Sequence, residues 1–194
     1  ENFNISNDRI NQDRSSKFIS NTFACSGLFT KNNIVNNVEG ENCLSELNGV
    51  FTPSHNEHID NHTLINHLVP NCQSFENYKG IVKGNGVGVF NGKVIVHENA
   101  QKIEAFRKNN NILLDKDAVI YSKPELEIYA DDVKCSHGST TGQFNLDSIF
   151  YLRSRGISLK KAKELMILGF INEVIQKCND SDFQNFIIDS LLKN

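Results

Sequence analysis

The densest group of side chains that could do chemistry lies in one short run, Asp131-Asp132-Val133-Lys134-Cys135-Ser136-His137-Gly138. If residues 132–137 are extended, Cys135 and His137 lie on the same side of a strand, because successive side chains alternate between its faces. An imidazole beside a thiol can favour the thiolate for nucleophilic work, or the two can bind a soft metal such as iron or zinc. The spacing also leaves open a buried cysteine beside a surface histidine.

Two enzyme classes fit this run poorly. A cysteine protease would also need an orienting Asn or Asp and an oxyanion hole, and a Cys-x-His pair within one strand has poor geometry for that. In a β-helical enzyme acting on polysaccharides, Asp131 and Asp132 would form the acid/base pair. We expect adjacent strand residues to face opposite ways, which makes them a poor dyad.

Four histidines lie within one window, His55, His58, His62 and His67. On a helix they would cluster, and a stand-alone metal-binding module is therefore an alternative. The surrounding residues instead indicate a loop followed by a strand. In that strand His62 and His67 would lie on opposite faces, as hydrogen-bonded polar residues.

Composition and the remaining motifs exclude several functions. The net charge of -3 and the lack of a basic block argue against a nucleic-acid binder. No stretch suits a membrane span or a signal peptide, and the start at Glu1 is typical of a fragment. The five scattered cysteines predict reduced thiols in the cytoplasm rather than a disulfide framework or zinc ribbon. The run Lys83-Gly84-Asn85-Gly86-Val87-Gly88 lacks a P-loop ending and indicates a turn between strands.

Short β-type runs bounded by turn formers fill the chain from about residue 16 to residue 141. They fit a sandwich, a barrel or a β-solenoid. About one residue in seven is asparagine. In a solenoid, stacked asparagines can hydrogen-bond along the axis and tolerate left-handed turn positions, although a biased genome would produce the same composition.

After Gly142 the period changes to that of helices. We expect a first helix capped by Asn145 or Asp147, a second capped by Ser158, and a third capped by Asp180 or Ser181. The second has apolar residues on more than one face, which suits burial against the β part or docking of a partner.

Several motifs then occur in one order between His62 and Ile157. They are His62-Thr63, Ile65-Asn66-His67, Tyr78-Lys79-Gly80, Gly88 to Val94, Ala100-Gln101-Lys102, Ile112-Leu113-Leu114, Lys123 to Gly138, and Phe150 to Ile157. Together they resemble the SufB/SufD core family of the SufBCD iron–sulfur cluster assembly complex. The run KPELEIYADDVKCSHG is specific for its SufD branch. SufB-type sequences carry a cysteine before the apolar run that resembles Ile112-Leu113-Leu114, where this chain has Asn109-Asn110-Asn111.

The resemblance implies a mainly β fold, a right-handed parallel β-helix followed by a small C-terminal α-helical domain. We expect an N-terminally truncated β-helix over residues 1–142 and a SufC-docking domain over residues 143–194. The implied role is a non-catalytic scaffold that pairs with SufB through the β-helix and binds the SufC ATPase through the helices. For the SufC contact we expect Phe150, Tyr151, Arg153 and Arg155.

The implied assembly site lies at the interface with SufB. His137 corresponds to the histidine implicated there and is a transient metal ligand, and Cys135 is its motif neighbour. The resemblance implies no tightly bound cofactor, a transient Fe–S cluster at the interface, and ATP bound by SufC rather than by this chain.

Overall fold

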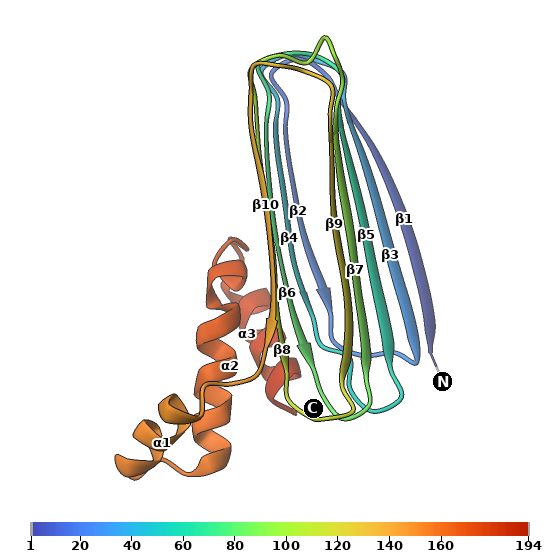
Figure 1. The fold of residues 1–194 in the computed structure, drawn as a ribbon. Helices are drawn as coiled ribbons and strands as arrows, with labels where there is room; N and C mark the ends of the chain where they lie inside the picture. Colours follow the sequence, from blue (N-terminus) through green and yellow to red (C-terminus); the bar gives the residue numbers. More distant parts are fainter. Residues whose placement is uncertain (1, 194) are drawn as a thin grey trace.

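The computed structural model describes residues 2–193, with side chains up to Leu191, and in this range ten strands precede three helices (Figure 1). The strands are β1 (Phe3–Gln12), β2 (Lys17–Ala24), β3 (Phe29–Val38), β4 (Leu44–Phe51), β5 (His58–His67), β6 (Gln73–Val82), β7 (Val87–Val96), β8 (Ile103–Leu113), β9 (Val119–Ile128) and β10 (Val133–Gly142). The helices are α1 (Leu146–Ser154), α2 (Leu159–Ile175) and α3 (Ser181–Lys193). The outer ends of the two predicted domains, Glu1 and Asn194, lie outside the described residues.

The strands form two parallel sheets that face each other (Figure 1). One sheet has the order β1-β3-β5-β7-β9 and the other the order β10-β8-β6-β4-β2. Each turn of the chain therefore adds one strand to each sheet, and about five turns make a solenoid. The predicted parallel β-solenoid with C-terminal helices is confirmed.

Side chains alternate between the interior of the solenoid, here called the lumen, and its outer faces. In β7, Phe90, Val94 and Val96 point into the lumen and are at most 3% exposed. Because the strands pair in register, inward side chains of successive turns stack into columns along the axis. This stacking fills the core, and it brings residues about 30 positions apart into contact.

The corners explain part of the asparagine content. Asn42 and Asn71 adopt positive φ, 60° and 61°, in equivalent corners, which Asn tolerates better than most residues. On an outer face the side chain of Asn66 donates to Asn37 at 2.8 Å, and that of Asn37 donates to Asn11 at 3.0 Å. The expected stacking of asparagines along a solenoid is thus present.

The three helices begin where their caps were predicted. The side chains of Asn145, Ser158 and Asp180 each accept from backbone N–H groups of the first helical turn. Helix α2 packs on the outer face of β4 and β6, where Ile171 and Val174 contact the cluster that holds Val50 and Ile81. Burial is thus one use of its apolar residues. Helix α1 has no buried residue.

Candidate functional site

Strand β10 places Cys135 and His137 on one side, as the sequence predicts. Cys135 pairs with Ala105 of β8 and His137 pairs with Arg107. Ala105 and Arg107 are buried inward-facing residues, 2% and 3% exposed, so Cys135 and His137 continue inward columns. Since β10 is the last strand of its sheet, no further turn covers them within residues 2–193. His137 is therefore exposed and Cys135 half-buried.

The environment of Cys135 favours the neutral thiol. Burial raises the pKa of Cys135 above its usual value of 9.0, and the backbone of Ala105 opposes this by hydrogen bonding. Cys135 also packs against the apolar core of the solenoid. A thiolate at this position would therefore need an additional stabilising partner, such as a metal ion.

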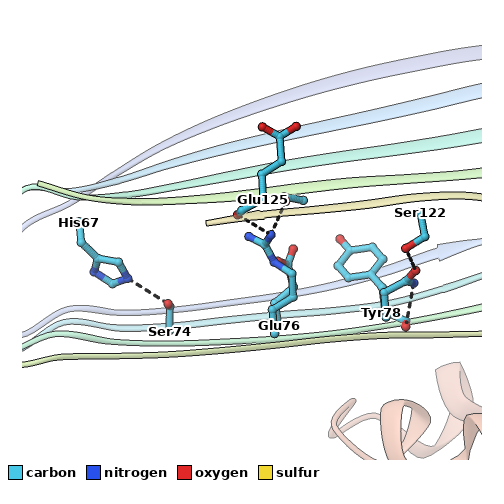
Figure 2. Close-up of polar contacts among 9 residues, drawn as sticks. His67, Ser74, Glu76, Tyr78, Ser122 and Glu125 are labelled. Atoms are coloured by element: carbon cyan, nitrogen blue, oxygen red, sulfur yellow. Dashed lines mark hydrogen bonds and ion pairs between the residues drawn. The ribbon is translucent and has the colours of Figure 1, made fainter. Parts of the chain in front are cut away.

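A buried ion pair lies beneath His137 in the same column. Glu76 of β6 pairs with Arg107 of β8, which pairs with His137. Arg107 Nε donates to the carboxylate of Glu76, and both side chains are 2% exposed. Arg107 Nη1 donates across the lumen to the carbonyl oxygens of Gly92 and Glu125, the latter at 3.1 Å. Figure 2 shows that Glu76 and Glu125 come from opposite sides of the lumen.

A second polar column closes the end of the solenoid. Ser122 Oγ of β9 donates to Asn109 Oδ1 at 2.7 Å, and it lies 2.8 Å from Ser139 Oγ of β10. Asn109 Nδ2 in turn donates to the carbonyl oxygen of Tyr78 at 3.2 Å (Figure 2). These contacts join β9 to β10 across the lumen, next to the column that ends in His137.

The four histidines within residues 55–67 form no group of three or more potential metal ligands in the described part of the chain. His67 points into the lumen, is fully buried, and lies 2.9 Å through Nε2 from Ser74 Oγ. Burial lowers the pKa of His67 to about 4, so this ring is neutral at physiological pH. His62 points outward, 2.8 Å from a carboxylate oxygen of Asp60. The predicted placement of His62 and His67 on opposite faces is confirmed.

One prediction about the Asp-Asp run is wrong. Asp131 and Asp132 lie in the corner between β9 and β10 rather than in a strand. Short polar side chains favour such bends, because they hydrogen-bond to nearby backbone groups. Both aspartates are exposed to solvent. A carboxylate dyad at this corner would stand on the outside of a turn, where Asp132 borders a hollow of about 520 Å³ that Asp131 does not line.

The predicted partner-contact residues lie on or next to α1. Phe150 and Tyr151 are 74% and 57% exposed, and the guanidinium of Arg155 lies 5.3 Å from the centre of the Tyr151 ring. Arg153 is exposed beside them. A hollow of about 320 Å³ lies between α1 and the β8–β9 corner, lined in part by Leu114. No helix in the described part of the chain has the length and apolar character needed to cross a membrane.

The Glu76–Arg107 pair is the part of the site that sequence reasoning missed. The two residues are 31 positions apart, close to one turn of the solenoid. Each also occupies an inward position of its strand. A search for opposite charges at inward positions one turn apart could have found them, but only after the period of the solenoid was known.

Comparison with known proteins identifies the family to which the chain is similar. A family model described as "SUF system FeS cluster assembly, SufBD core domain" matches residues 1–170. The chain is 38% identical over 169 residues to iron-sulfur cluster assembly protein SufD of Escherichia coli (strain K12), covering 87% of this chain and 40% of that protein. It is 36% identical over 141 residues to an iron-sulfur cluster assembly SufBD family protein of Mycobacterium leprae (strain TN), covering 69% and 36%. It is 37% identical over 139 residues to protein ABCI7, chloroplastic, of Arabidopsis thaliana, covering 71% and 29%. The chain thus spans at most 40% of the length of these relatives.

Proposed function

The chain belongs to the SufBD core family of iron–sulfur cluster assembly proteins, and on this premise we propose that it is a SufD-type scaffold subunit without a catalytic site of its own. The observation that carries the proposal is the position of His137 and Cys135. Both continue inward columns, yet they lie on the end strand of a sheet, where no further strand of the described chain covers them. A second protein docked on this end would complete the site.

The partner we propose for this end is SufB. Strands β9 and β10 are end strands of their sheets, and end strands offer unpaired backbone groups to another chain. Exposed aromatic residues lie on β9 and directly after it, with Tyr121 63% and Tyr129 61% exposed. Pairing of two solenoids through these strands would enclose His137 between them.

In such a composite site His137 would act through its imidazole. A neutral imidazole can bind iron or accept a proton near a bridging sulfide. Cys135 would be a second soft ligand, since a metal ion favours loss of the thiol proton. The growing cluster is the cargo of this site and is held transiently.

The second proposed partner is the SufC ATPase, bound by the helices. Phe150 and Tyr151 lie on α1, which has no buried residue in the part of the chain that the structure describes, and Arg153 and Arg155 add positive charge on or next to the same helix. Aromatic and arginine side chains commonly dominate protein interfaces. ATP would be bound by SufC, because no P-loop sequence occurs in this chain.

Reconstitution with SufB and SufC tests the proposal. We expect His137→Ala to reduce cluster formation, followed by visible absorption and by iron and sulfide content, without preventing complex formation. His97→Ala is the matched control, because His97 is an exposed histidine in the corner after β7. Undiminished cluster formation with His137→Ala would sink the site claim. Failure of the protein to retain SufB or SufC on a sizing column would sink the corresponding partner claim.

A further inference from the structure

Arg107 joins four strands through one side chain. It extends from β8, its guanidinium binds Glu76 of β6, and it donates to the carbonyl oxygens of Gly92 on β7 and Glu125 on β9. We propose that Arg107 is the positioning residue of the assembly site: it holds β9 against β8 and so fixes the wall opposite His137 and Cys135. The inference rests on the proposed function, because it assigns a role in that same site.

The sheet order explains why the bond from Arg107 to the carbonyl oxygen of Glu125 matters. Within its sheet β10 pairs only with β8, and β9 pairs only with β7. Away from the corner at residues 129–132 that joins them, the two end strands therefore depend on contacts across the lumen for their relative position. The contacts closest to the site are the bond from Arg107 to Glu125 and the pair of hydroxyl groups of Ser122 and Ser139.

The lumen is shaped to admit the guanidinium. Gly92 occupies an inward position of β7, between Phe90 and Val94. A Cβ atom at residue 92 would lie 3.0 Å from Arg107 Cζ and 2.9 Å from the ring of Phe90. A larger residue would therefore push the guanidinium off the carbonyl oxygens. The glycine leaves the space through which Arg107 reaches the far sheet.

The chemistry of the pair indicates geometry rather than stability as its contribution. Arg107 Nη2 and Glu76 Oε1 are buried and have no hydrogen-bond partner among the described residues. Buried charges are costly to desolvate, and well-packed apolar replacements of both partners are often equally stable. What an apolar pair cannot supply is the fixed, directional bond to the carbonyl oxygen of Glu125.

The test separates positioning from stabilisation by removing the charges of Glu76 and Arg107 together. In Arg107→Met alone, Glu76 remains buried without its partner, so a general loss of stability is expected. Combining Glu76→Leu with Arg107→Met removes both charges and restores the midpoint of unfolding. We expect amides of β9 and β10 in this double variant to exchange hydrogen about tenfold faster than in the unmodified protein. Amides of β3 and β4 serve as the internal reference and remain unchanged.

Cluster formation is then measured in the complex with SufB and SufC. The double variant should be about tenfold slower despite its restored stability, corresponding to about 1.4 kcal/mol. Lys17→Met is the matched control, because it removes an ion pair with Glu46 at the other end of the solenoid, on β2, where the side chain of Lys17 is 55% exposed. It should change neither exchange nor assembly.

Each result of these experiments either supports or overturns the proposed role of Arg107. Unchanged exchange in β9 and β10, or full assembly by the double variant, overturns the role of Arg107. If the double variant does not fold, Arg107→Lys replaces it, since lysine keeps the charge beside Glu76 but loses the planar fork. Undiminished assembly by His137→Ala refutes the proposed function instead. In that case hydrogen exchange still decides whether Arg107 holds β9 and β10 in place.

Discussion

Lys79 and Glu173 form the ion pair that fastens α2 to the outer face of the solenoid, with 3.0 Å between Nζ and Oε2. The same ammonium group donates to the carbonyl oxygen of Phe170 at 2.7 Å and lies 5.1 Å from the centre of its ring. The side chain of Lys79 is 8% exposed, whereas that of Glu173 is 59% exposed. Strand β6 therefore contacts the helix through Lys79 and the lumen through its neighbour Tyr78.

Replacing Lys79 should loosen α2 selectively. We expect Lys79→Met to lower the free energy of unfolding by about 1–2 kcal/mol, because hydrogen bonds of a buried charged group are lost. Amides of α2 should lose protection in hydrogen exchange more than those of β7. Lys177→Met is the control: Lys177 is 53% exposed and 3.7 Å from Glu46, so an effect below about 0.5 kcal/mol is expected. Equal effects of the two substitutions would contradict this role of Lys79.

The same pair predicts a dependence on acid. The hydrogen bond from Lys79 lowers the pKa of Glu173 below its usual value of 4.5. A depressed carboxyl pKa contributes stability above the unfolded value and loses it as the pH falls through the folded value. The difference between Lys79→Met and the unmodified protein should therefore shrink below about pH 4.5, as urea titrations at several pH values can measure.

Burial of His67 predicts a loss of stability at a higher pH than that expected for Glu173. Its folded pKa of about 4 lies below the usual 6.5, so between these values the unfolded chain binds more protons. Stability should fall as the pH drops from 6.5 to 4, by at most on the order of 3 kcal/mol from this group. In His67→Gln, which can still hydrogen-bond to Ser74, the decline should be smaller by that amount. His97→Gln, in the exposed corner after β7, is the control that should follow the unmodified protein.

The backbone conformation at Asn71 predicts which substitutions this corner tolerates. Its φ of 61° is tolerated by Asn and Gly but is strained for β-branched residues. Asn71→Val should therefore destabilise the protein by about 1–2 kcal/mol in chemical denaturation. Asn71→Gly should stay within about 0.5 kcal/mol. A ranking in the opposite order would show that the side chain of Asn71, and not its backbone, matters at this corner.

The thiol of Cys135 should react slowly at neutral pH. Because burial raises its pKa above 9.0, little thiolate is present, and only the thiolate is nucleophilic. Alkylation by iodoacetamide, quantified for this cysteine by mass spectrometry, should accelerate as the pH rises past 9. The denatured protein is the reference, in which the same cysteine should react faster at every pH. Rapid alkylation of the folded protein at pH 7 would contradict the neutral thiol.

Binding of SufC, if the proposed function holds, should depend on the exposed face of α1. We expect Phe150→Ala to weaken binding by at least about tenfold, since an exposed aromatic residue at an interface can contribute more than 1.4 kcal/mol. Its free energy of unfolding should stay within about 0.5 kcal/mol of the unmodified protein. Tyr121→Ala is the control, because Tyr121 is similarly exposed but lies on β9. Equal affinity of both variants for SufC would argue against this surface.

Much of the fold is predictable from local patterns in the sequence. The helix caps at Asn145, Ser158 and Asp180 follow from residue type and the following apolar period. The common side of Cys135 and His137 follows from strand alternation alone. The choice of a solenoid over a sandwich came from the family resemblance, because short alternating strands are common to both.

The missed features depend on how successive turns pair. Between β3 and β5 paired residues are 29 positions apart, and between β6 and β8 they are 31 apart. The corners set these differences, and no local pattern states which residue of the next turn lies opposite. The Glu76–Arg107 contact therefore could not be predicted before the period of the solenoid was known. The corner at Asp131 and Asp132 was missed although short polar residues favour such bends.

At β10 the solenoid ends, and side chains at inward positions become accessible on its surface. In the turns between the two end strands of this sheet, residues at the positions of His137 and Cys135 face a neighbouring turn on both sides, as Arg107 and Ala105 do. One additional turn would cover both residues and make them ordinary buried residues of the lumen. The proposed binding by these two residues would therefore depend on where the repeat stops, and lengthening the solenoid at this end should abolish it without altering a single residue of the site.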